Sequence, residues 1–146
     1  MSNKNMNNEI TVYSSKKELK HILYCIHNDL KEYNLSNDCK FRLSVVIEEI
    51  FINIIKHGYK NVEDNKVKMS YEIEEDPLAI TVEFVDEGIL FNPVIYMDNL
   101  DLYMEIIGSN YKESGLGILI IKNSVDEITY KNDNNQNMLK FKKILE

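Results

Sequence analysis

The apolar and polar residues near the start of the chain predict a short strand followed by a helix. Residues 10–13 have the composition of a strand. From Leu19 to Asn34, apolar residues recur every three or four positions, which is the spacing of one helix face. Ser15 and Glu18 precede this helix at the spacing of a capping box, so they are expected to satisfy its first free N–H groups.

A second helix is predicted from the polar cluster at 36–38 to His57. Serine, asparagine and aspartate favour helix starts, because their side chains accept hydrogen bonds from the first free N–H groups. Between 45 and 55 this helix is apolar nearly all round, which predicts burial on most of its sides. Gly58 follows it and is expected to close it in the left-handed conformation.

Four later segments alternate between apolar and polar residues and predict strands. They are 67–73, 78–84, 127–131 and 138–144. The turn at 75–77 predicts that the first two form a hairpin.

The segment between these two pairs of strands has a weaker pattern. Residues 92–113 show no strong period, and loops of that length in a compact domain are usually lids or binding loops. A short apolar helix is expected at 116–123. The complete order predicts an α+β fold: a two-layer sandwich of one mixed, mainly antiparallel sheet with helices on one face.

The composition fits one globular domain and argues against two classes of partner. The length of 146 residues predicts a single domain over 1–146, with the polar residues 1–9 as a flexible tail. The formal net charge of −7 disfavours direct binding to nucleic-acid phosphates. No apolar run is long enough to span a membrane, and the N-terminus lacks the features of a signal peptide, so a cytoplasmic protein is expected.

Glu49, Asn53 and His57 follow one another at four-residue spacing and share one face of the second predicted helix. A buried carboxylate and a buried amide need partners, and a divalent cation bound through oxygen would satisfy both. A solvent-exposed stripe that also includes Lys56 and Lys60 explains the same spacing. The spacing alone leaves both interpretations open.

The chain contains only five glycines, so each marks a position where the backbone needs one. Asp86 ends a predicted strand two residues before Gly88. An ionised carboxylate there can accept a hydrogen bond from an exocyclic amine such as that of adenine. An Asx-type turn that ends the strand is the simpler alternative.

The segment Ser114-Gly115-Leu116-Gly117 stands at the predicted start of the last helix, where backbone N–H groups attract phosphate. It differs from a dinucleotide-binding fingerprint, because Ile120 stands at the place of the third glycine and no strand precedes it. The sequence of a P-loop is also absent. A glycine turn into a helix is the alternative.

In their order and spacing, these three segments resemble the motifs of the GHKL ATPase superfamily. The stretch from Glu49 to Tyr59 resembles its N box, 86–93 resembles its first glycine box, and 113–118 resembles its second. The single-domain size, the Asn-x-x-x-His-Gly-Tyr ending and the Ser-Gly-x-Gly segment are most similar to the anti-sigma-factor serine-protein kinases of the RsbW and SpoIIAB type. The resemblance extends from about Ile10 over nearly the whole chain.

The resemblance implies a Bergerat-type ATP site. Asn53 would hold Mg²⁺ against the phosphates, Glu49 would be the general base toward a serine or threonine hydroxyl, and Asp86 would bind the adenine amine. Residues 92–113 would form the lid. The residues implied to contact the nucleotide are Asn53, His57, Asp86, Gly88, Phe91, Lys112, Ser114, Gly115, Leu116 and Gly117.

The resemblance also implies a function. It is that of an ATP-dependent serine/threonine kinase that sequesters a sigma factor and phosphorylates an anti-anti-sigma STAS-domain protein, with a homodimer as the expected assembly. The chain departs from the family pattern where Asn137-Met138 replaces the common Gly-Thr and where Glu48 precedes the implied base. Three alternatives stay open: an ATP-binding module without efficient phosphotransfer, the detached ATP-binding domain of a histidine kinase, and an α+β domain that binds no nucleotide.

Overall fold

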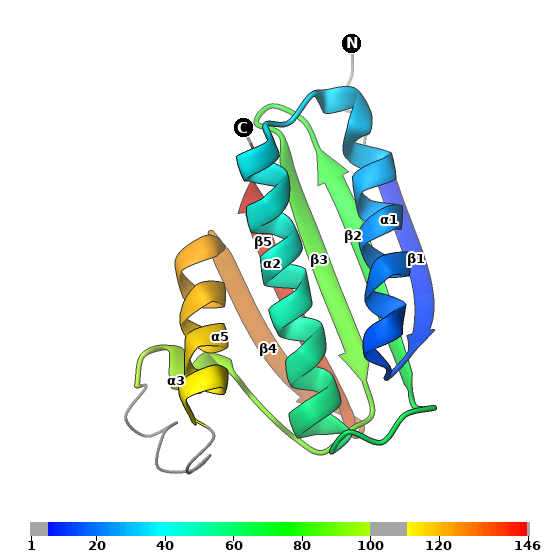
Figure 1. The fold of residues 1–146 in the computed structure, drawn as a ribbon, viewed down its shortest axis with the longest axis vertical. Coiled ribbons are helices and arrows are strands. Elements are labelled where there is room, and N and C mark those ends of the chain that lie inside the picture. The colour runs from blue at the N-terminus through cyan, green and yellow to red at the C-terminus, as the bar shows by residue number, and fades with distance from the viewer. Residues whose placement is uncertain (1–5, 100–110, 146) are drawn as a thin grey trace.

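A computed structural model describes residues 6–99 and 111–145 of the chain, with side chains for 8–99 and 117–145 (Figure 1). Its sheet has five strands in the order β1-β2-β3-β5-β4. They are β1 (Met6–Tyr13), β2 (Lys66–Glu74), β3 (Ala79–Asp86), β4 (Glu127–Asp133) and β5 (Gln136–Ile144).

Every pair of neighbouring strands in this sheet is antiparallel. The sequence predicted a mixed, mainly antiparallel sheet; the antiparallel part of that prediction is confirmed, and no parallel pair occurs among the described strands. The first strand also begins earlier than the pattern indicated. Residues 6–9, expected as part of a flexible tail, pair with β2 from Met6 opposite Ile73 onward. Backbone pairing needs no apolar side chains, so polar residues can join the strand.

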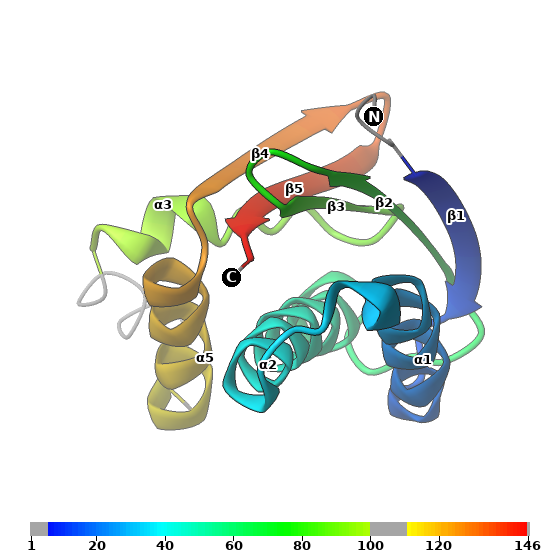
Figure 2. The ribbon, with the colours of Figure 1, turned by 90° about the horizontal axis from the view of Figure 1, so that it is seen from above.

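The long helices cover one face of the sheet, as Figure 2 shows from above. They are α1 (Leu19–Leu30), α2 (Asn37–Asn53) and α5 (Tyr111–Ser124). Shorter turns extend or connect them: η1 (Lys16–Glu18), η2 (Lys31–Tyr33), η3 (Ile54–Gly58) and α3 (Val94–Met97). Among the helices of the described part of the chain, none is long and apolar enough to cross a membrane.

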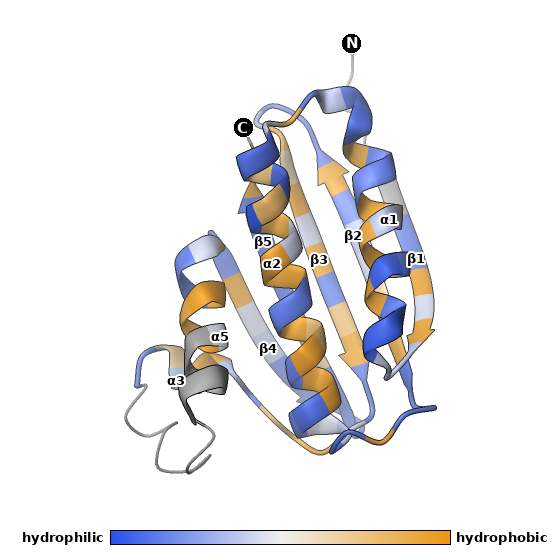
Figure 3. Cartoon of the chain, viewed as in Figure 1, coloured by the Kyte–Doolittle hydropathy of each residue, from blue (hydrophilic) through white to orange (hydrophobic). Residues whose placement is uncertain are grey.

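The hydrophobic core lies between the helices and the sheet. The alternation of β2 and β3 directs one set of side chains toward the helices, and Phe51, Phe84 and Phe141 are completely buried there. Figure 3 shows the same alternation as bands of hydrophobic and hydrophilic residues along the strands. The α+β two-layer sandwich predicted from the sequence is therefore confirmed.

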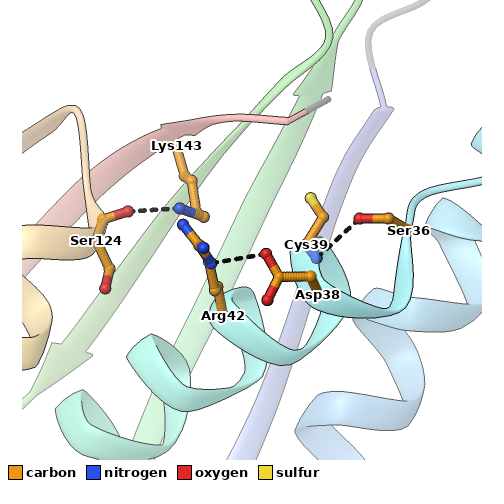
Figure 4. Close-up of polar contacts among 6 residues, drawn as sticks. All are labelled: Ser36, Asp38, Cys39, Arg42, Ser124 and Lys143. Atoms are coloured by element: carbon orange, nitrogen blue, oxygen red, sulfur yellow. Dashed lines mark hydrogen bonds and ion pairs between the residues drawn. The ribbon is translucent and has the colours of Figure 1, made fainter.

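Ser36 begins α2 as the sequence predicted. Its side chain accepts a hydrogen bond from the backbone N–H of Cys39 at 3.1 Å, which satisfies one of the free donors of the first turn. In the same turn, Asp38 forms an exposed ion pair with Arg42 (Figure 4). The capping box predicted before α1 is wrong: Glu18 accepts from the N–H of Tyr13, and Ser15 makes no cap bond.

The end of α2 also differs from the expected left-handed glycine cap. The helix continues into one π-helical turn, η3, which includes Gly58. The chain takes positive φ angles only afterwards, at Lys60 and Asn61. Gly58 is therefore not the left-handed cap, and its carbonyl lies against Gly88 instead.

The last helix begins earlier than the sequence predicted. Gly115-Leu116-Gly117 lies inside α5, which starts at Tyr111, so the expected glycine turn into the helix is wrong. At the other end, Lys143 Nζ on β5 donates to the carbonyl oxygen of Ser124 at 2.6 Å, which ties the end of α5 to the sheet (Figure 4). A cation at a helix C-terminus satisfies free carbonyls and the helix dipole together.

Candidate functional site

Asp86 is the last residue of β3 and is almost completely buried, with 5% of its surface exposed. Its Oδ1 accepts from the backbone N–H of Gly88 at 2.9 Å and from Asn137 Nδ2 at 3.0 Å. Burial raises the pKa of the Asp86 carboxyl, and these two hydrogen bonds oppose that rise. The Asx-type turn and a carboxylate held at a cavity therefore occur together at this residue.

Gly88 lies against the end of α2. A Cβ on Gly88 would stand only 2.6 Å from the carbonyl carbon and oxygen of Gly58. The N–H of Ile89 donates to the same Gly58 oxygen at 2.8 Å, so the two backbones are joined here. Glycine is required at 88 because two backbone segments approach each other closely there.

Asn53 stands at the last position of α2 and is buried, with 7% of its surface exposed. Its Nδ2 finds no hydrogen-bond partner among the described residues. A buried amide without a partner costs free energy, which is a mark of a group kept for a ligand. The solvent-exposed stripe considered for this helix face does not describe Asn53.

Asn53 and Asp86 line the same cavity between the sheet and the helices. Its other lining residues are Ile50, Ile54, Phe91, Pro93, Ile121, Tyr130, Asn137 and Leu139. The cavity has a volume of about 20 Å³, which is room for about one water molecule. A nucleotide base is much larger than that volume.

Glu49 lies one helical turn before Asn53 and is half-buried. Burial raises the pKa of its carboxyl; neighbouring Glu48 raises this pKa further and Lys56 lowers it. A Cβ on Gly117 of α5 would overlap Glu49 Oε1. Glycine at 117 thus makes room for the carboxylate where α5 passes α2.

His57 and Phe91 form an aromatic wall next to the cavity. Their rings stack with centroids 4.4 Å apart, and Tyr96 stacks on Phe91 at 5.9 Å. Burial, with smaller contributions from Lys56 and Lys60, lowers the pKa of His57 to about 4. The imidazole is therefore neutral at pH 7 and packs as an aromatic ring.

Asn137 is a buried polar residue of the site to which the sequence pattern assigned no role. It pairs in register with Asp86 across β3 and β5. The signal that could have found it is the alternation of β5, since Asn137 shares the core-facing side with Leu139 and Phe141. A polar residue on that side needs a buried partner.

The structure thus gathers one part of the predicted site and leaves another part untested. Asn53, Asp86 and Phe91 border one cavity. His57 stacks on Phe91 and the N–H of Gly88 donates to Asp86, so these two contact residues of the cavity wall. Glu49 and Gly117 contact each other and are not among its lining residues. Lys112, Ser114, Gly115 and Leu116 lie in the first turns of α5, and their side chains are outside the described ones.

Comparison with known proteins identifies the family. Residues 14–143 match the family model described as a histidine kinase-like ATPase domain. Because this match covers most of the chain, the protein belongs to the histidine kinase-like ATPase domain family. The resemblance seen in the three motifs is confirmed.

Individual relatives have more specific names. An anti-sigma F factor of Clostridium beijerinckii is 30% identical over 95 residues, which are 63% of this chain and 58% of that protein. A serine-protein kinase RsbW of Staphylococcus epidermidis is 29% identical over 87 residues, 58% of this chain and 54% of that protein. The matched stretch therefore spans little more than half the length of these relatives.

A solved structure supports the fold. The crystal structure of the RsbU and RsbW domains of a Mycobacterium tuberculosis protein matches with a TM-score of 0.64 at 13% identity. The match covers 96% of this chain and 32% of that chain. The two-layer sandwich is thus the Bergerat-type fold of RsbW domains.

Proposed function

We propose that this histidine kinase-like ATPase domain is an ATP-dependent serine/threonine kinase that acts as an anti-sigma factor. The observation that carries the proposal is the shared cavity of Asn53 and Asp86, with Glu49 one turn away on α2. The printed names of the relatives, anti-sigma F factor and serine-protein kinase RsbW, support the same activity.

Asp86 is proposed to receive the adenine amine. Gly88 and Asn137 already occupy its Oδ1, and an ionised carboxylate has a second oxygen that can accept the amine. Phe91, supported by His57, offers an aromatic surface beside the base. These contacts bind and orient the base and perform no chemistry.

Asn53 is proposed to hold Mg²⁺, which is an oxygen-seeking cation. The residue type fits, because the amide oxygen of Asn53 is a hard ligand and the residue is buried and lines the cavity. Its unpartnered Nδ2 is a donor and would face a phosphate oxygen. The described residues contain no group of three or more histidine, cysteine or acidic side chains that could hold a metal alone. This suits an ion held mostly by phosphates and water; when bound, Mg²⁺ neutralises phosphate charge during transfer.

Glu49 is proposed to accept the proton of the serine or threonine hydroxyl. Its raised pKa makes it a better proton acceptor than an exposed glutamate, provided that it is ionised. Lys56 opposes the rise, and a cation at Asn53 would oppose it further. The phosphates are proposed to meet the start of α5, where the free N–H groups precede Ser114. The proposed phosphate-facing residues of its first two turns are Lys112, Ser114, Gly115, Leu116 and Gly117.

The proposed protein partners follow from the relatives. They are a sigma factor, which the protein would sequester, and an anti-anti-sigma STAS-domain protein, which it would phosphorylate on serine or threonine. The proposed location is the cytoplasm. A homodimer is the proposed assembly, and light scattering that detects only monomer would exclude it.

The test uses labelled ATP and candidate STAS proteins. Wild type is expected to transfer label to one of them, and Glu49→Gln is expected to abolish transfer while ATP affinity stays within about twofold. Glu48→Gln is the matched control, because it removes the same charge from the adjacent exposed residue. Equal activity of Glu49→Gln and wild type would exclude Glu49 as the base.

An ATP-binding regulatory module without efficient phosphotransfer is the second candidate. The observation that favours it is the packing of Glu49 Oε1 against Gly117, which places α5 beside the proposed base. This candidate predicts ATP binding by wild type and no labelled STAS protein. The kinase and the ATP-binding module thus differ in whether a phosphorylated STAS protein is formed.

A further inference from the structure

The side-chain amide of Asn137 joins β5 to the segment that follows β3. Nδ2 donates to Asp86 Oδ1 at 3.0 Å, to the carbonyl oxygen of Gly88 at 3.1 Å and to that of Ile89 at 3.3 Å. Only 4% of Asn137 is exposed, so these bonds form away from water. In such surroundings a hydrogen bond to a carboxylate is strong.

Three acceptors determine which end of this amide faces Asp86. Nδ2 meets only a carboxylate oxygen and two carbonyl oxygens, so the reversed amide would lose all three of these hydrogen bonds. At the other end, Asn137 Oδ1 accepts from the hydroxyl of Tyr130 and from Asn132 Nδ2, so β4 holds the oxygen.

This arrangement fixes the orientation of Asp86. Its Oδ1 is held from two sides, by the N–H of Gly88 and by Asn137, and both residues at this register position border the cavity. The described residues donate no hydrogen bond to Oδ2. A carboxylate clamped by one oxygen offers the other one in a fixed direction.

We propose that Asn137 is a positioning residue that clamps Oδ1 of Asp86, so that Oδ2 is the fixed acceptor for the exocyclic amine of the purine. The inference rests on the proposed ATP site and adds to it the residue that determines base selectivity. Asn137 does not touch the base in this role and acts through Asp86.

A purely structural role is the alternative, because the same amide ties β5 to the segment after β3 by hydrogen bonds to Gly88 and Ile89. This alternative is called the staple below. Both roles predict some loss of stability when Asn137 is replaced. They differ in selectivity: a positioning residue affects nucleotides that carry the amine, whereas a staple affects all nucleotides equally.

The experiment measures dissociation constants for ATP and for purine riboside triphosphate, which lacks the 6-amino group, in the presence of Mg²⁺. Wild type is expected to prefer ATP by about 10-fold or more, as for a lost hydrogen bond to a charged group. In Asn137→Leu, ATP affinity is expected to fall by about that factor while affinity for the analogue stays within about twofold. Asn137→Thr, whose hydroxyl can donate, is expected to recover part of the preference.

Asn132→Ala is the matched control, because it removes one bond to Asn137 Oδ1 and leaves the contacts of Nδ2. It is expected to keep most of the preference for ATP. Thermal unfolding without nucleotide checks that each variant folds. Should Asn137→Leu not fold, Asn137→Ala carries the same test, because it also removes the donor and adds no bulk beside the buried carboxylate.

Equal losses for ATP and the analogue in the variants would overturn the inference in favour of the staple. Unchanged ATP affinity would overturn it as well. Wild type that binds neither triphosphate would instead overturn the proposed function. The two failures are thereby distinguishable.

Discussion

The backbone contact between Gly58 and Gly88 tolerates no side chain on Gly88. In Gly88→Ala the new Cβ would stand 2.6 Å from the carbonyl of Gly58, and backbone atoms cannot give way as a flexible side chain can. We expect the free energy of unfolding to fall by about 1–3 kcal/mol, which urea denaturation measures.

Gly58→Ala is the matched control for this prediction. Its Cβ would have its nearest neighbour, Asp86 Oδ1, at 3.5 Å, which is ordinary van der Waals contact. Position 58 also lies in a helical turn without positive φ, so alanine fits there. Equal destabilisation by both substitutions would show that the contact is not what requires glycine at 88.

His57 gives a prediction about pH. Its pKa is about 4 in the folded protein against 6.5 for the free side chain, so between these values only the unfolded chain takes up the proton. The contribution of this residue to stability is complete above pH 6.5 and falls as pH drops toward 4. Unfolding of His57→Gln is expected to depend less on pH in this window than unfolding of wild type.

An NMR titration of the His57 ring measures the same quantity directly. We expect its resonances to shift with a midpoint near 4. A midpoint at 6.5 would contradict the burial of the ring against Phe91. With a midpoint at 6.5, the difference in pH dependence between wild type and His57→Gln would also be absent.

Single residues of the site were predictable where a motif defines them and unpredictable where their partner is distant in sequence. Asp86 and Asn53 stand in recognisable local patterns, and the structure places them at one cavity. Asn137 lies 51 positions from Asp86, and only the pairing of β3 with β5 brings the two together. Glu49 meets Gly117 only because α5 packs on α2.

At the scale of elements, α2 carries Glu49 and Asn53, and its start is fixed by Ser36. In Ser36→Ala the N–H of Cys39 loses its partner, and we expect a loss of about 1 kcal/mol in the free energy of unfolding, measured in urea. Ser36→Asp is the control, because it keeps an acceptor and adds a favourable charge at the helix start. If alanine and aspartate behave alike, the cap does not stabilise α2.

Helices and strands were predictable where buried residues recur at a regular spacing, and their ends were less predictable. The alternation in β2 and β3 and the helical spacing in α1 report the two layers directly, because each period places one side in the core. Helix ends depend on local hydrogen bonds and tertiary contacts. This explains why α2 continues into a π-helical turn and why α5 begins before its glycines.

At the scale of the whole molecule, the site lies between the two layers, so its volume depends on how the helices sit on the sheet. The cavity holds about one water molecule in this conformation. We therefore expect the binding of a base to include the free energy of widening the cavity. A protein that is only partly in the competent state has a correspondingly lower apparent affinity.

The last prediction concerns how nucleotide binding raises the stability of the folded protein. A ligand that binds only the folded protein stabilises it, by about 2.7 kcal/mol at a concentration 100 times its Kd. For a domain of this size that corresponds to a rise in Tm of roughly 5–10 °C, measured by scanning calorimetry. We expect this rise with ATP and Mg²⁺ together, and in Asn53→Ala a smaller rise that no longer depends on Mg²⁺, because the buried amide proposed to hold the ion is gone. An Asn53→Ala protein that responds to Mg²⁺ as wild type does would exclude Asn53 as the ligand. The absence of any shift at millimolar nucleotide would mean that the layers do not open for ATP, and the proposed site would then be wrong as a whole.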